Sequence, residues 1–129
     1  MFLNPAENGE RFTGLADIYH QARPSLPEYA MQILTRYLEH KPRLVVDIGC
    51  GTGLSTSAWQ AYAEKVIGIE PNDDMLRAAK RLENDKVSFL HAYAHATNLA
   101  AESADIAVCS QSFHWMEPKT TLAEIQRIL

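Results

Sequence analysis

A short apolar run followed at once by closely spaced glycines limits the fold of this chain more than any other feature of its sequence. Residues 44–48 read Leu-Val-Val-Asp-Ile, a nearly continuous apolar pattern typical of a strand buried on both faces. The next residues carry a G-x-G-x-G pattern (Gly49, Gly51 and Gly53), and residues 55–64 can continue as a helix. A buried strand, a glycine turn and a helix in this order predict the opening of an α/β unit.

The rest of the chain alternates between strand and helix patterns. A helix is expected over residues 26–40, with Ser25 as its N-cap and Pro27 in its first turn. Three further strands are expected over residues 66–70, 87–91 and 104–110. Helices are expected after Asn72 and over residues 121–129, where Thr121 and Glu124 have the spacing of a capping box. This alternation predicts a parallel sheet with helices on both faces.

Length and composition favour one globular domain. The chain has 129 residues, of which 47% are hydrophobic and 22% charged, and its formal net charge of −4 offers no basic footprint for nucleic acid. The cysteines, Cys50 and Cys109, lie at the ends of apolar runs without C-x-x-C spacing, so neither a disulfide nor a metal site is expected. No stretch has the character of a membrane span or a signal peptide, so a cytoplasmic location is the default expectation.

The position of Glu70 indicates what the glycine turn binds. In an open parallel sheet, ligands bind beyond the carboxyl ends of the strands. Glu70 closes the second strand roughly 20 residues after the glycines, where an acidic side chain can accept both hydroxyls of an adenosine ribose. A tight turn without a ligand and a dinucleotide site are the alternatives. Leu54 stands where the third glycine of G-x-G-x-x-G would fall, which disfavours the dinucleotide.

At these positions the chain resembles the class I S-adenosylmethionine-dependent methyltransferases, of the type 11/25-like kind. Residues 45–55 and 67–71 resemble motifs I and II of this family, and residues 103–108 and 112–115 resemble its fourth strand and the segment after it. Residues 19–27 are similar to the trans-aconitate methyltransferase-like subgroup. The resemblance implies a Rossmann-like three-layer αβα fold with a parallel sheet of about four strands in the order 3-2-1-4.

The resemblance also implies how S-adenosyl-L-methionine would be bound. Asp47 and the glycine turn would lie beside the methionine portion, Glu70 would take the ribose hydroxyls, and Arg23 with Tyr19 would meet the cofactor carboxylate. Asp74 or Met75 would flank the adenine, although a methionine at helical spacing fits the helix core equally well. The expected cofactor-binding set is Tyr19, Arg23, Asp47, Gly49, Cys50, Gly51, Gly53, Glu70, Pro71, Met75, His95, Ala96 and Gln111.

Adenine recognition departs from the family pattern. The family commonly has an acidic residue followed by a small one after the third strand, where the carboxylate accepts the adenine amino group. In this chain the corresponding pair is His95 and Ala96. A neutral histidine can still accept a hydrogen bond, so a ring nitrogen would replace the carboxylate as the acceptor for the adenine amino group.

The expected function is methyl transfer to a small-molecule acceptor. Because the sulfonium is already an activated electrophile, the protein mainly aligns the acceptor and excludes water. Gln111, His114 and Trp115 follow the fourth strand, close to the expected methyl group. His114 is the candidate base, with a structural role beside Trp115 as the alternative. A carboxylate acceptor, which the subgroup suggests, would need no base because it is already ionised.

The resemblance further implies that the domain is incomplete at its C-terminal end. We expect one domain over residues 1–129, with a leader and first helix over residues 1–41 and the Rossmann-like core over residues 42–129, lacking three strands of the family. The outer edge of the fourth strand would then be unpaired, which favours a homo-oligomer. A cofactor-binding or partner-binding module without turnover is therefore the alternative to an active enzyme.

Overall fold

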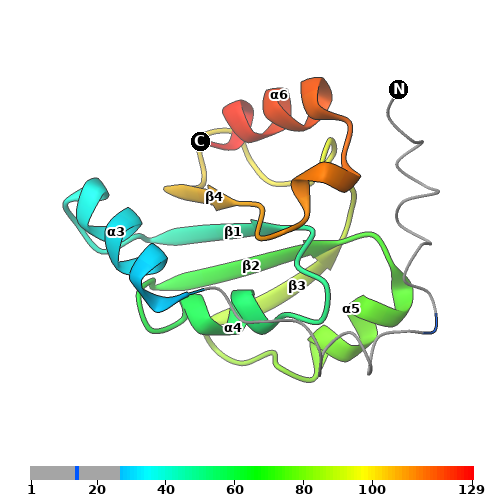
Figure 1. Cartoon of the computed structure of the whole chain (residues 1–129), viewed down its shortest axis with the longest axis horizontal. Helices are drawn as coiled ribbons and strands as arrows, with labels where there is room; N and C mark the ends of the chain where they lie inside the picture. The colour runs from blue at the N-terminus through cyan, green and yellow to red at the C-terminus, as the bar shows by residue number, and fades with distance from the viewer. Residues whose placement is uncertain (1–13, 15–26) are drawn as a thin grey trace.

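A parallel four-stranded sheet forms the centre of the molecule. The computed structural model describes Gly14 and residues 27–129. The strands are β1 (Leu44–Ile48), β2 (Lys65–Glu70), β3 (Val87–His91) and β4 (Ile106–Val108), and they lie in the order β3-β2-β1-β4 (Figure 1). The expected Rossmann-like α/β fold and its strand order are therefore confirmed.

Helices cover both faces of this sheet. The helices α3 (Glu28–Leu38), α4 (Leu54–Trp59) and α5 (Asp73–Lys80) pack on one face, and α6 (Pro118–Ile128) packs on the other (Figure 1). Successive strand residues point to opposite faces. Val45 accordingly lies in the core under the first three helices, whereas Val46 lies in the core with Ile128 of α6.

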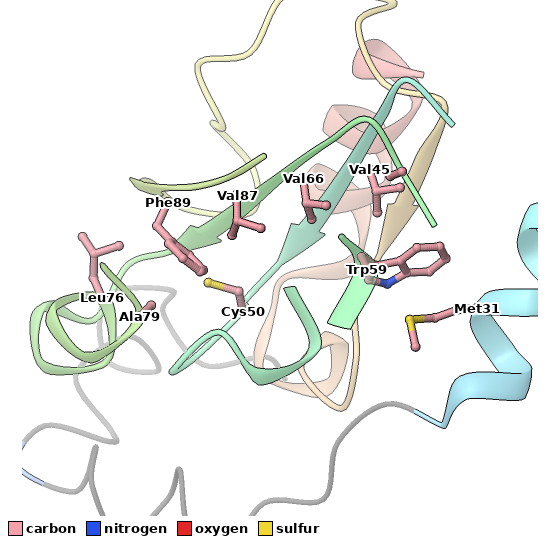
Figure 2. Packing of buried hydrophobic residues seen from close by; sticks show 10 residues of the cluster. Met31, Val45, Cys50, Trp59, Val66, Leu76, Ala79, Val87 and Phe89 are labelled. Atoms are coloured by element: carbon pink, nitrogen blue, oxygen red, sulfur yellow. The ribbon is translucent and has the colours of Figure 1, made fainter. Parts of the chain in front are cut away.

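The larger core is anchored by Trp59 and Phe89. Trp59 of α4 is fully buried, and Met31 is the buried residue that α3 contributes beside it (Figure 2). Phe89 of β3 lies among Cys50 and the inward side chains of α5 in the same view. Both rings therefore lie on the face of the sheet that supports the glycine turn.

The helices α3 and α4 differ from the bounds that the sequence predicts. α3 begins at Glu28, with Pro27 at the N-cap and not in the first turn, and Ser25 lies outside the described residues. α4 ends at Trp59, five residues earlier than residue 64. The helix ends early because the backbone N–H groups of Glu64 and Lys65 donate to the carbonyls of Pro42 and Arg43. These two hydrogen bonds place the start of β2 beside β1.

The start of α6 also differs from the sequence prediction. The helix begins at Pro118, and the Glu117 carboxylate caps it by accepting the N–H groups of Lys119 and Thr120. The expected capping box is wrong, because Thr121 and Glu124 lie inside the helix and are both buried. Proline at the first helical position, where its missing N–H costs nothing, was the signal for this start.

β4 is shorter than the expected strand over residues 104–110. Other partners replace the pairing of β4 with β1 on either side of β4. The Ala104 N–H donates to the carbonyl of Ile128 in α6, and the carbonyl of Ile48 in β1 accepts the Ser112 hydroxyl. Within the described residues, none of the helices is long and apolar enough to pass through a bilayer.

Candidate functional site

The glycine turn connects β1 to α4 with a left-handed backbone conformation that residues with side chains rarely adopt. Gly49, Gly51 and Gly53 all have positive φ angles of 71°, 59° and 87°. A Cβ on Gly53 would lie 2.7 Å from the Phe89 ring, and a Cβ on Gly49 would lie 2.7 Å from the Met116 methyl group. The turn is therefore held between β3 on one side and the segment after β4 on the other, and only glycine fits these two positions.

Glu70 points into the glycine turn from the end of the neighbouring strand. It is 7% exposed, and one carboxylate oxygen, Oε1, accepts the Gly51 N–H at 2.8 Å. The other oxygen accepts the Asn72 N–H at 2.9 Å. Register brings the two together, because Ile48 pairs with Ile69 and both strands end at the same edge of the sheet. The expected convergence of a glycine turn and a carboxylate is thus present in the geometry.

Asp47 lies beneath the turn and is 1% exposed. Its Oδ2 accepts the Thr56 hydroxyl at 2.8 Å, which ties the end of β1 to α4. Burial and the negative charge of Asp47 raise the pKa of the Cys109 thiol to about 11. Burial first, then Asp47 and Glu70, raise the pKa of Cys50 well above its ordinary value. Both cysteines therefore stay as thiols at neutral pH, and the Cys50 side chain belongs to the core.

The start of α5 lies directly after Glu70. Asn72 caps this helix by accepting the Met75 N–H at 3.1 Å, while its own N–H orients Glu70. Met75 is 1% exposed and packs as helix core, and Pro71 is half-buried. His91, paired with Glu70 across the sheet, donates from Nε2 to the Pro71 carbonyl at 2.8 Å. Asn72 and His91 are orienting residues that the sequence did not single out as part of the site.

The loop after β3 presents an aromatic pair at the same edge of the sheet. His95 is exposed and stacks on Tyr93, with ring centroids 5.4 Å apart and planes inclined by 23°. Ala96 is exposed and donates its N–H to the Tyr93 carbonyl. His95 and Ala96 thus form the tip of a tight turn that follows β3.

The segment after β4 completes the surroundings of the glycine turn. Gln111 is exposed and has a φ of 58°, which is unusual for a residue with a side chain. His114 and Trp115 lie in η1 (Phe113–Trp115), with ring centroids 4.5 Å apart. His114 is exposed, and the Trp115 N–H donates to the Ser112 carbonyl.

Two predicted ligands of the cofactor carboxylate, Tyr19 and Arg23, lie outside the described residues. Among the residues that are described, His, Cys, Asp and Glu form no group of three or more that could hold a metal ion. The described part of the site therefore consists of the glycine turn, Glu70 and three flanking segments.

A parallel α/β sheet with a glycine turn and a carboxylate at the ends of neighbouring strands is typical of domains that bind nucleotide-containing cofactors. Comparison with known proteins narrows this class. Residues 46–129 match the model of the family described as a methyltransferase domain. The chain therefore belongs to the class I S-adenosylmethionine-dependent methyltransferase domains, and the predicted cofactor is confirmed at the level of this family.

Relatives and solved structures agree with this assignment. The chain is 29% identical over 117 residues to CRG1 of Saccharomyces cerevisiae, named a probable S-adenosylmethionine-dependent methyltransferase, and covers 40% of it. It is 27% identical over 125 residues to a candidate methyltransferase of Dictyostelium discoideum, covering 97% of this chain and 47% of that protein. A candidate type II methyltransferase from Anaeromyxobacter dehalogenans superposes with a TM-score of 0.74 at 27% identity, over 82% of this chain and 44% of that one. The chain thus spans less than half the length of these relatives.

Proposed function

We propose that this chain binds S-adenosylmethionine at the carboxyl ends of β1 and β2, and that it is the cofactor-binding part of a methyltransferase acting on a small molecule. The observation that carries the proposal is the hydrogen bond from the Gly51 N–H to Glu70 at 2.8 Å, which joins the glycine turn to a buried carboxylate. Each carboxylate oxygen has two acceptor positions, and backbone N–H groups already orient both oxygens. Such a carboxylate is preorganised to accept the two hydroxyls of a ribose.

The remaining parts of the cofactor follow from where the flanking residues lie. The methionine portion would pass along the turn from Gly49 to Gly53, above Asp47. The adenine would lie beside Pro71, at the start of α5, with His95 and Ala96 on the other side. Arg23 and Tyr19 are proposed to meet the cofactor carboxylate, for which a guanidinium is well suited. Gln111 would then lie at the end of the cofactor that carries the methyl group.

We further propose an oxygen acceptor, and specifically a carboxylate. A relative from Hamiltonella defensa, 25% identical over 127 residues, is named malonyl-[acyl-carrier protein] O-methyltransferase, and this chain covers 49% of it. A carboxylate acceptor is ionised at neutral pH, so the protein needs to align it with the methyl group and need not remove a proton. His114, exposed in η1, would be required as a base only for an acceptor that must lose a proton.

Calorimetric titration of the chain with S-adenosylmethionine, and with its demethylated product, tests the cofactor site. Glu70→Gln keeps the size of the side chain but replaces one acceptor oxygen by a donor. We expect this change to weaken binding by about 1–3 kcal/mol, or roughly 5- to 150-fold. Thermal unfolding of the same variant shows whether the fold has been kept.

Asp105→Asn is the matched control, because the Asp105 carboxylate also accepts a backbone N–H, that of Arg43 at 2.6 Å, but this contact lies before the start of β1, at the opposite end of that strand from the glycine turn. It should leave the affinity unchanged. Equal affinity of Glu70→Gln and the parent chain would contradict the ribose assignment. Binding without transfer of labelled methyl to any acceptor would instead support a cofactor-binding module.

A further inference from the structure

The sheet separates between β1 and β4 at the edge that carries the proposed cofactor site. The last paired residues of these strands are Asp47 and Val108, and the carbonyl of Ile48 lies one residue beyond that pair. The Ser112 hydroxyl donates to this carbonyl at 2.8 Å, and Ser112 is only 6% exposed. The Ser112 side chain thus takes the place of β4 as the hydrogen-bond partner of β1, at the edge of the sheet where ligands bind in folds of this kind.

Further contacts hold the same segment against the glycine turn. The Ser55 hydroxyl at the start of α4 donates to the Ser110 hydroxyl at 3.4 Å. The Met116 methyl group and the Ser112 side chain also occupy the space that a Cβ on Gly49 would need. The segment after β4 therefore rests on the turn at two places, on either side of Gln111.

Gln111 itself lies in the left-handed region, with a φ of 58°, where a residue with a side chain costs about 1–2 kcal/mol. Such a conformation persists only when its neighbours impose it. The flanking contacts of Ser110 and Ser112 supply that constraint.

We infer that Ser112 is a positioning residue for methyl transfer. By tying the segment after β4 to the last carbonyl of β1, it holds Gln111 and η1 in a constant position relative to the cofactor turn. An acceptor approaching from this side then meets the methyl group in line. The inference rests on the function proposed above, and it assigns to Ser112 no contact with the cofactor.

The test compares Ser112→Ala with Ser103→Ala. Ser103 also donates a hydroxyl hydrogen bond to a backbone carbonyl, that of Ala100 at 2.7 Å, but it lies before β4 and away from the turn. Transfer of labelled methyl to trans-aconitate, used as a probe carboxylate, is measured at saturating S-adenosylmethionine. We expect Ser112→Ala to slow transfer by about tenfold to a hundredfold, while the dissociation constant of the demethylated product stays within about threefold of the parent value.

Fluorescence gives a second measurement that needs no turnover. The chain has two tryptophans, of which Trp59 is fully buried and Trp115 is half-buried on the segment in question. Acrylamide should therefore quench mainly Trp115. We expect quenching to increase in Ser112→Ala and, to a smaller extent, in Ser112→Cys, whose thiol is a weaker hydrogen-bond donor than the hydroxyl, but not in Ser103→Ala.

Quenching and transfer rates equal to those of Ser103→Ala would overturn the inference, as would a loss of cofactor affinity as large as the loss in rate. If Ser112→Ala does not fold, Ser112→Cys decides by the same two measurements. Failure of the parent chain to bind the demethylated product would refute the proposed function instead, and the quenching comparison would still decide whether Ser112 holds the segment.

Discussion

Gly53 is constrained both by its backbone conformation and by the packing of the core against it. Its φ of 87° belongs to a region that side chains avoid, and a Cβ there would come within 2.7 Å of the Phe89 ring. Phe89 is 2% exposed and packs in the main core, so it has little room to move. The conformation of the cofactor turn is therefore coupled to the packing of β3.

Gly53→Ala should lower the free energy of unfolding by about 2–5 kcal/mol, because the left-handed backbone and the overpacked ring both oppose the new methyl group. Urea denaturation measures the change. Gly14→Ala is the control, because Gly14 has a similar φ of 80° and none of the described residues lies within 4 Å of a new Cβ there. An effect of Gly53→Ala no larger than that of the control would show that Phe89 does not constrain the turn.

Between elements, Glu124 joins α6 to the loop that follows β3. Its Oε2 accepts both the N–H and the hydroxyl of Thr97, at 2.8 and 2.6 Å, and its carboxylate pairs with Arg127 at 2.7 Å. Arg127 in turn donates to the Leu99 carbonyl at 2.6 Å. The hydrogen bonds from Arg127 and Thr97 outweigh burial and lower the pKa of Glu124 to about 2. The loop that carries His95 and Ala96 is thus anchored to α6 through a buried carboxylate.

This anchor should make the free energy of unfolding depend on pH in the acid range. Because the folded pKa of Glu124 is about 2 and the ordinary value is 4.5, the unfolded chain binds more protons between these values. Its stabilisation is therefore fully present above about pH 4.5 and is lost as the pH falls toward 2. Glu124→Gln should cost about 1–3 kcal/mol at pH 7, and its deficit relative to the parent chain should shrink in acid. Urea denaturation at a series of pH values checks this.

Thr97→Val keeps the carboxylate but removes one of its donors, so its deficit at neutral pH should be smaller than that of Glu124→Gln. Parallel stability curves for the parent chain and Glu124→Gln across the acid range would show that Glu124 does not carry this dependence.

Across the fold, the strand order places β4 at one end of the sheet, next to β1. β4 has three paired residues, all half-buried, and Leu122 on the neighbouring α6 is 55% exposed. An edge strand of this kind presents backbone N–H and C=O groups to a further strand. The predicted homo-oligomer would form along this edge.

Light scattering coupled to size exclusion measures the expected self-association. The apparent mass should rise above 14.5 kDa, the mass of one chain, as the protein concentration increases. A constant mass of one chain throughout the concentration range would rule out association along β4.

Local patterns accounted for most of the architecture. The apolar runs predicted β1, β2 and β3 at or within a residue of their bounds, because a strand buried on both faces leaves a continuous apolar signal. The glycine spacing and Glu70 likewise pointed to one edge of the sheet, since the carboxyl ends of parallel strands meet there. These features depend on neighbours in sequence and on general rules of α/β connection.

Contacts between distant residues decided the rest. The early end of α4 and the short β4 follow from hydrogen bonds to Pro42 and Ile128, which join segments far apart in the chain. The start of α6, in contrast, is set locally by the Glu117 cap. Ser112 and Thr97 gained their roles only because folding brought them to Ile48 and Glu124, 64 and 27 residues away. A buried polar group takes whatever partner the packed chain places within reach, so its pairing is settled by the three-dimensional arrangement and leaves no periodic trace in sequence.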